Sequence, residues 1–360
     1  MMDPCKQLQE IPAISSEALE AFRRELPQLL IFVNDKFNNE DKFFTDSACP
    51  AGKTALIKQF NRNMGSLMLG VYEFSLYEDI IEELLWHVAA AESRGLKLDF
   101  FSTAVKSWIM AIHYTIKRPQ SDQLVQPLVW LQLNAARLYE KLAVHEADLD
   151  GDAKNFLDLL LQKNRKFAAE YVLTLIRSGK TIENVYSSVL LPAYIKIRLM
   201  WRRSIITIAD EHAAIDTLRY IIFRVMDNIF GERSYPFKAL VACMPGEESV
   251  LSGEIFANFL EIKGWSVSFI GHTAAAEDII HSAAAIKPQV VALSIFSIAS
   301  LPGASNLIRQ IHTLLPEAKT AVEGRAALIA QKRFEPMVDA VIAGFDAGHN
   351  KMLTMVMPHA

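Results

Sequence analysis

The chain has 360 residues, enough for two or three domains that each bury a core. It carries 37 basic and 41 acidic residues, and this near balance, a net charge of −4, argues against a surface that coats nucleic acid. The three cysteines (Cys5, Cys49 and Cys243) lie far apart, which excludes a disulfide framework or a Cys-x-x-Cys metal site. No apolar run approaches the ~20 residues that span a bilayer, and the first residues lack the features of a signal peptide. We therefore expect a cytoplasmic protein that contacts neither membrane nor nucleic acid directly.

The first 145 residues divide into two parts. We expect residues 1–53 to form a partly irregular N-terminal segment and residues 54–145 to form a helical domain. One helix of that domain carries an apolar stripe of Ile80, Ile81, Leu84, Leu85 and Val88. The acidic stretch 145–155 follows. It lacks the glycine position and the closing glutamate of a calcium loop, so we interpret it as a linker or helix cap.

The remaining sequence predicts a helical cap followed by an α/β domain. Residues 154–231 have the pattern of four helices, and residues 236–360 alternate between strands and helices. The strands are continuous apolar runs, as in a parallel sheet that is buried on both faces. Right-handed crossovers then give a doubly wound, five-stranded sheet. Ligands of such folds bind beyond the carboxyl ends of the strands, here at 244–253, 271–278, 294–303 and 323–328.

The cap contains an unusual group of side chains. Trp201 is followed ten residues later by Glu211 and His212, which enter the apolar stripe of a predicted helix at its first turn. In one interpretation the acid and the imidazole cap the helix and Trp201 is part of the core. In the other they form a lid, with the indole on a flat ligand and Glu211 and His212 at its rim or its metal.

The segment from 156 to about 345 resembles the cobalamin-binding module of light-sensing transcriptional repressors, corrinoid methyl-transfer proteins and related sensors. The likeness rests on "SSVLLPAYIKIRLMWRRSIITIADEHAAID", with the Trp-x9-Glu-His pattern of the light-sensing branch, and on "ACMPGEESVLSG", "VVALSIFSIASLPG" and "AVEGRAAL". It implies a four-helix cap before a Rossmann-like domain, with the corrinoid between them. More weakly, residues 54–143 resemble the extra helical domain of some of these sensors, including photoreceptors that add a bilin.

The resemblance assigns roles to several positions. Trp201 matches the tryptophan over the upper face of the corrin, and Glu211 with His212 matches the Glu-His pair. Gly246 and Glu247 match the Gly-Glu that opens the first ligand turn. Ser294, at the end of the third strand, and Gly324, at the end of the fourth, complete the expected binding residues together with Ser249 and Ser252.

The sequence departs from the family mainly on the sheet side. Ser249 stands where the family has the histidine below cobalt, and Ser252 where a glycine makes room for the nucleotide tail. Glu323 replaces the first of two glycines past which that tail runs, and Arg202 stands where some light sensors have a histidine. A serine hydroxyl is a poor cobalt ligand, and overpacking a slot costs about 1–3 kcal/mol.

A replacement metal ligand would have to come from another histidine. His212 and His272 are the candidates nearest the expected site, and His87 and His113 lie in the N-terminal helices. For His272, a solvated loop residue is the simpler interpretation, and for His87 a structural histidine at the edge of an apolar stripe.

Three hypotheses follow. In the first, the chain is a non-catalytic sensor or regulator that binds a tetrapyrrole and signals through a protein partner. The tetrapyrrole is cobalamin without the sheet histidine, or haem or a bilin. In the second, it is a ligand-free interaction module, and in the third a corrinoid methyl-transfer protein. No nucleophile–base pair or paired-carboxylate site stands out, so we expect no enzyme. The apolar composition suits a dimer or partner docking.

Overall fold

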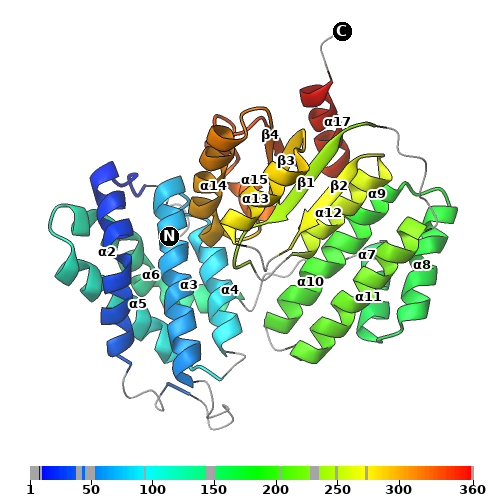
Figure 1. The fold of residues 1–360 in the computed structure, drawn as a ribbon. Helices are drawn as coiled ribbons and strands as arrows, with labels where there is room; N and C mark the ends of the chain where they lie inside the picture. Colours follow the sequence, from blue (N-terminus) through cyan, green and yellow to red (C-terminus); the bar gives the residue numbers. More distant parts are fainter. Residues whose placement is uncertain are drawn as a thin grey trace. The chain divides into compact units, whose positions relative to one another are not determined.

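The computed structural model describes residues 8, 10–37, 43–44, 53–92, 95–142, 149, 151–202, 205–227, 235–247, 250–271 and 275–357. The chain divides into two compact units (Figure 1). The first consists of 1–146 with 202–204, and the second of 147–201 with 205–360. No helix in the described ranges is long and apolar enough to cross a membrane.

The first unit is built from helices. They are α2 (Ser16–Asp35), α3 (Lys53–Phe74), α4 (Ile80–Glu92), α5 (Leu98–Thr115) and α6 (Gln120–Leu142). Helix α2 was not among the expected elements. It is capped by the Ser15 hydroxyl, which accepts from the Ala18 N–H, and it packs on α3 and α5. Its buried Phe22 lies edge-on to Tyr72 of α3 at 5.1 Å between ring centroids. Residues 16–35 thus share a core with the helices that follow and belong to the same compact unit.

The second unit begins with a bundle of helices that we call the cap. It consists of α7 (Gly151–Leu161), α8 (Arg165–Arg177), α9 (Ile182–Val185), the π-helical segment η2 (Tyr186–Leu190), α10 (Leu191–Arg202) and α11 (Ile208–Asp227). Segments α9, η2 and α10 follow one another without a break, so the cap has four helical rods, as predicted. Pro192, near the start of α10, has no N–H for a regular helical bond, which accounts for the π turn before it. Helix α7 starts inside the acidic stretch, where Asp152 pairs with Lys180.

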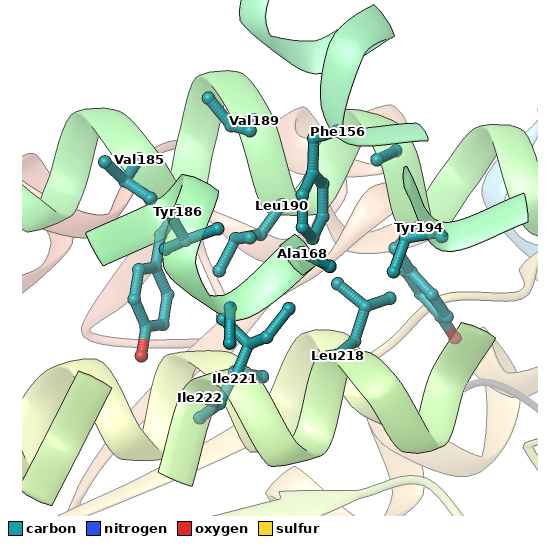
Figure 2. Close-up of a cluster of buried hydrophobic side chains, with 14 of the residues drawn as sticks. Phe156, Ala168, Val185, Tyr186, Val189, Leu190, Tyr194, Leu218, Ile221 and Ile222 are labelled. Atoms are coloured by element: carbon teal, nitrogen blue, oxygen red, sulfur yellow. The ribbon is translucent and has the colours of Figure 1, made fainter. Parts of the chain in front are cut away.

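The cap core is apolar and extends into the next domain. Figure 2 shows Tyr186 and Leu190 of η2 pointing toward Leu218 and Ile221 of α11. Leu251 and Ile255 of α12 belong to the same buried cluster. The cap and the α/β domain therefore share side chains, which fixes α10 and α11 next to the first turn of α12.

The α/β domain is a parallel five-stranded sheet with strand order β2-β1-β3-β4-β5. Its strands are β1 (Lys238–Cys243), β2 (Ser266–Ile270), β3 (Val290–Ser294), β4 (Lys319–Glu323) and β5 (Ala340–Ile342). The connecting elements are α12 (Leu251–Ile262), α13 (Ala276–Ile286), η3 (Ile298–Ser300), α14 (Leu301–Leu314), α15 (Arg325–Ile329), α16 (Gln331–Phe334) and α17 (Phe345–Val356). The predicted doubly wound fold is confirmed.

Burial of the sheet follows strand position. Strands β1, β3, β4 and β5 are buried almost throughout, as continuous apolar runs predict. Strand β2 lies at the edge of the sheet and is only half-buried, and its sequence Ser-Val-Ser-Phe-Ile alternates polar and apolar residues. Burial on both faces was therefore the wrong expectation for this strand.

Candidate functional site

The site lies where the strand order reverses. The chain leaves β1 toward one side and β3 toward the other, so the turns after these adjacent strands flank the crevice that ligands use in doubly wound folds. Gly246 in the first turn has φ +80°, a left-handed conformation that favours glycine. The predicted glycine is therefore required by the turn itself, whatever the turn binds.

A buried ion pair stands on the cap side of the site. Arg198 of α10 donates from Nη1 to Oε1 of Glu211 on α11 over 2.7 Å. The two side chains are only 6% and 2% exposed. Removing two charges from water is costly unless their geometry is good, so this pair is a specific feature of the cap. Arg198 was not among the residues predicted from the sequence, although it lies in the basic stretch "IKIRLMWRR".

Trp201 and His212 lie around this pair. The guanidinium carbon of Arg198 is 5.2 Å from the centre of the half-buried Trp201 ring, as in a cation–π contact. His212 Nε2 is 3.6 Å from Oε2 of Glu211, but its side chain is 68% exposed. We predicted that both Glu211 and His212 enter the apolar stripe, and this is wrong for His212. Neighbouring residues on a helix are about 100° apart, so only one of the two faces the core.

A pocket of about 280 Å³ opens between the cap and the start of α12. It is lined by Tyr194, Arg198, Glu211, His212, Ile215, Asp216, Arg219, Val250 and Leu251. Helices α10 and α11 supply positively charged hydrogen-bond donors and negatively charged acceptors to this pocket. Val250 and Leu251 form the end of the turn after β1. Two of the three predicted lid residues, Glu211 and His212, therefore share one pocket with the predicted ligand turn.

Glu247 bridges the two turns of the crevice. Its carboxylate accepts hydrogen bonds from the N–H groups of Phe296 (2.9 and 3.0 Å) and Ser297 (3.1 Å), which follow β3. Burial raises its pKa to about 8, and the nearby charge of Glu323 adds to that shift. The side chain thus ties the β1 turn to the β3 turn instead of pointing into the pocket as a free acid.

Three polar side chains end the sheet on the face covered by α12 and α17. Strand register aligns Cys243 with Ser294, and Ser294 with Glu323. They follow Val241, Ala292 and Ala321 by two residues, so they face the same side as that apolar cluster, which includes Phe256 of α12. We call Cys243, Ser294 and Glu323 the terminal row. Burial raises the pKa of Glu323 to about 7, and the Ser294 hydroxyl opposes that shift.

The backbone around the terminal row is tightly packed. A Cβ atom on Gly253 of α12 would lie 2.8 Å from Cys243 Sγ and 2.9 Å from Ser294 Cβ. A Cβ on Gly324, which has φ +100°, would lie 2.5 Å from the Ile295 carbonyl oxygen. Helix α12 and the turn after β4 therefore press directly against the ends of β1 and β3.

Polar atoms at this place lack partners. Oγ of Ser252, Oγ of Ser294 and Oε1 of Glu323 are buried and make no well-formed hydrogen bond, although the Ser294 hydroxyl lies near the Glu323 carboxyl. A buried polar group without a partner costs about 1–3 kcal/mol. Three such groups at one end of the sheet are not what packing alone favours.

The other predicted residues fall elsewhere. Ser249 and His272 lie outside the described residues, as does the side chain of Arg202. His87 and His113 belong to the first unit, where Nδ1 of His113 is 4.0 Å from Asp122. Within the described ranges, no three His, Cys, Asp or Glu side chains are grouped as a metal site requires.

Comparison with known families decides what kind of domain this is. Residues 237–349 match the model of the B12 binding domain. This segment belongs to the B12-binding domain family. The match covers β1 to α17 and includes Gly246, Glu247 and the terminal row. No curated protein matches the chain.

Similar solved structures share the fold only distantly. The monomethylamine corrinoid protein of Methanosarcina barkeri is 15% identical, with a TM-score of 0.48 over 56% of this chain and 97% of that protein. A cobalamin-binding protein of Desulfitobacterium hafniense is 13% identical, with a TM-score of 0.30 over 57% of this chain and 99% of that protein. The methanol:cobalamin methyltransferase complex of Methanosarcina barkeri is 12% identical, with a TM-score of 0.31 over 62% of this chain and 98% of that chain. Similarity at this level says nothing about what this chain binds.

The residues present do not fit the form of cobalamin that the resemblance implies. That form takes a histidine from the turn onto cobalt and inserts its nucleotide tail at the strand ends. The turn has serine at the histidine position, and the buried Glu323 side chain stands at the glycine past which the tail would run. On the cap side, the described residues form a pocket with polar partners.

Proposed function

We propose that this chain is a non-catalytic regulator that binds a corrinoid under its cap and passes the signal to a protein partner. The observation that carries the proposal is the pocket that joins the Arg198–Glu211 pair to Val250 and Leu251 at the strand-order reversal. This is the crevice in which doubly wound domains hold their ligands. Of the lining residues, Val250 and Leu251 lie in the segment that matches the B12 binding domain.

The pocket's chemistry favours a ligand with amide groups. A corrin ring carries amide side chains, each of which donates and accepts hydrogen bonds. Arg219 and His212 supply donors, and Glu211 and Asp216 supply acceptors. Pockets that enclose drug-sized ligands measure about 300–1,000 Å³. At about 280 Å³ this pocket takes part of the corrin periphery and leaves the rest of the ring outside it. Haem has carboxylates at its edge, and neither haem nor a bilin is supported by the family match.

A regulatory role is proposed because the turn has lost its metal ligand. In the corrinoid methyl-transfer proteins that the sequence resembles, cobalt cycles through oxidation states and normally uses a histidine below the metal. This sequence has Ser249 at that position. The near-neutral charge and the lack of a DNA-binding motif favour output through a protein partner.

The test is thermal unfolding of the full chain with hydroxocobalamin, haem or biliverdin. A ligand present at about 100 times its Kd stabilises the protein by about 2.7 kcal/mol. We expect only hydroxocobalamin to raise Tm. A rise with haem or biliverdin alone would assign the site to another tetrapyrrole.

One observation favours the second hypothesis, a ligand-free interaction module. The tight packing of Gly253 and the burial of Glu323 close the strand ends without any ligand. That alternative predicts no rise in Tm with any of the three tetrapyrroles. The same experiment therefore separates the two functions.

A further inference from the structure

We propose that Glu323 determines which corrinoids this chain accepts. Its side chain excludes the nucleotide tail from the space between α12 and the sheet, so the bound corrinoid keeps its nucleotide outside the domain core. This inference rests on the proposed corrinoid function and names the form of the ligand.

The space beside Glu323 at the strand ends is already filled. Glu323 is 6% exposed and is the last residue of β4, level with Ser294 and on the face of the sheet that α12 and α17 cover. The space between Gly253 of α12 and the side chains of Ser294 and Cys243 is too small even for a methyl group. A tail that entered here would have to displace the Glu323 side chain or separate α12 from the strand ends. Forcing even a few extra methylene groups into a packed core is destabilising, and a nucleotide is much larger.

The charge that Glu323 can carry also disfavours the nucleotide tail. Glu323 Oε1 is buried without a well-formed hydrogen bond, although the Ser294 hydroxyl lies near the carboxyl. The tail of cobalamin contains a phosphodiester, which carries a negative charge. Because burial raises the pKa of Glu323 to about 7, the carboxyl is largely ionised only above that pH. There it would repel the phosphodiester charge in a poorly solvated place, where like charges interact more strongly than in water.

Glu323 and Ser249, two departures from the family pattern, both suit a ligand whose nucleotide stays outside. Cobalamin whose tail stays outside keeps its own nucleotide base on cobalt and needs no protein histidine below the metal. A tail-less corrinoid equally needs no slot. One cause therefore explains both features, the slot filled by Glu323 and the serine at position 249. That cause is a ligand whose nucleotide does not enter the domain.

The experiment compares two ligands and three proteins. Hydroxocobalamin and cobinamide share the corrin ring, but cobinamide lacks the nucleotide. Kd values are measured by equilibrium dialysis for the full-length wild type, Glu323→Gly and Glu323→Gln. The glycine opens the slot, whereas the glutamine removes the charge and keeps the volume. Urea unfolding checks that each variant folds, and the absorption spectrum of bound hydroxocobalamin shows whether its base stays on cobalt.

We expect the wild type to bind cobinamide at least as tightly as hydroxocobalamin and to hold hydroxocobalamin with its base on cobalt. Glu323→Gly should tighten hydroxocobalamin by at least about tenfold, which is about 1.4 kcal/mol, and leave cobinamide nearly unchanged. Glu323→Gln should fall clearly short of that gain.

Two results overturn the inference while corrinoid binding stands. One is a wild type that prefers hydroxocobalamin more than about tenfold or binds it with its base off cobalt. The other is an equal gain for the glutamine and glycine variants. If no protein binds either ligand, the proposed function fails as well. If Glu323→Gly does not fold, the wild-type preference and spectrum still decide.

Discussion

Arg198 and Glu211 form a buried ion pair between two helices of the cap, with 2.7 Å between Nη1 and Oε1. The pair lines the pocket under the cap, and Arg198 also lies against Trp201. One arginine thus connects the two parts of the Trp-x9-Glu-His pattern that first pointed to this region.

Breaking this pair should destabilise the second unit. Glu211→Leu or Arg198→Met alone leaves an uncompensated buried charge, so we expect a loss of about 3–5 kcal/mol in the free energy of unfolding. The double variant Arg198→Met/Glu211→Leu removes both charges and should recover most of that loss. Urea unfolding followed by circular dichroism measures all four proteins. Additive losses in the double variant would contradict a direct pair.

The stability of the protein should fall as pH rises from about 5 to 8. Burial raises the pKa of Glu323 from its ordinary 4.5 to about 7 and that of Glu247 to about 8. The folded protein therefore holds these protons more tightly than the unfolded chain, which ionises first as pH rises. Each group contributes a slope of at most about 1.4 kcal/mol per pH unit in this window.

The matched variants for this effect are Glu323→Gln and the double variant Glu323→Gln/Glu247→Gln. Urea unfolding at pH 5, 6, 7 and 8 gives the free energy of unfolding at each pH. Its fall with pH should be less steep for the single variant than for the wild type, and least steep for the double variant. A wild type whose stability rises over this range, with variants that behave alike, would show that both carboxyls are ionised in the fold throughout.

Gly253→Ala should destabilise the α/β domain although alanine favours helices. The new methyl group would lie 2.8 Å from Cys243 Sγ and 2.9 Å from Ser294 Cβ, and such overpacking costs about 1–3 kcal/mol. Gly303→Ala on α14 is the matched control, since its methyl group would lie 3.5 Å from Met244 Cε, in ordinary contact. Thermal unfolding should show a lower Tm for the first variant only. Equal Tm values would mean that α12 moves freely away from the strand ends.

Trp201 should contribute to corrinoid affinity through its ring. Aromatic stacking adds about 0.5–1.5 kcal/mol, so Trp201→Ala should weaken hydroxocobalamin by about two- to tenfold. Trp201→Phe keeps an aromatic face and should lose less. Equilibrium dialysis compares the three proteins. An alanine variant that binds as well as the wild type would place the ligand away from the indole.

Much of the fold follows from hydrophobic pattern alone. Continuous apolar runs predicted the parallel strands, and helical stripes predicted the cap. Helix α2 was not predicted, although Ser15 and Glu17 form a regular helix start. Pro27 lies inside this helix, at a position where proline normally breaks a helix. Edge strand β2 differs from the others because only its neighbours in space, which the sequence does not show, decide its burial.

The site was predictable only in part. The resemblance assigned Glu211 and Glu247 to the ligand site and placed Glu323 where the family has a glycine. It did not reveal that Arg198 pairs with Glu211, or that Glu247 caps the turn after β3. Both contacts join segments whose register depends on packing between separate elements.

The most direct test of the central claim is equilibrium dialysis of the purified full chain against hydroxocobalamin, with the double variant Arg198→Met/Glu211→Leu as control. The account predicts one corrinoid per chain for the wild type and, because the pocket has lost its polar partners, at least about tenfold weaker binding for the folded variant. Absence of binding by the wild type, or equal binding by both proteins, would contradict it.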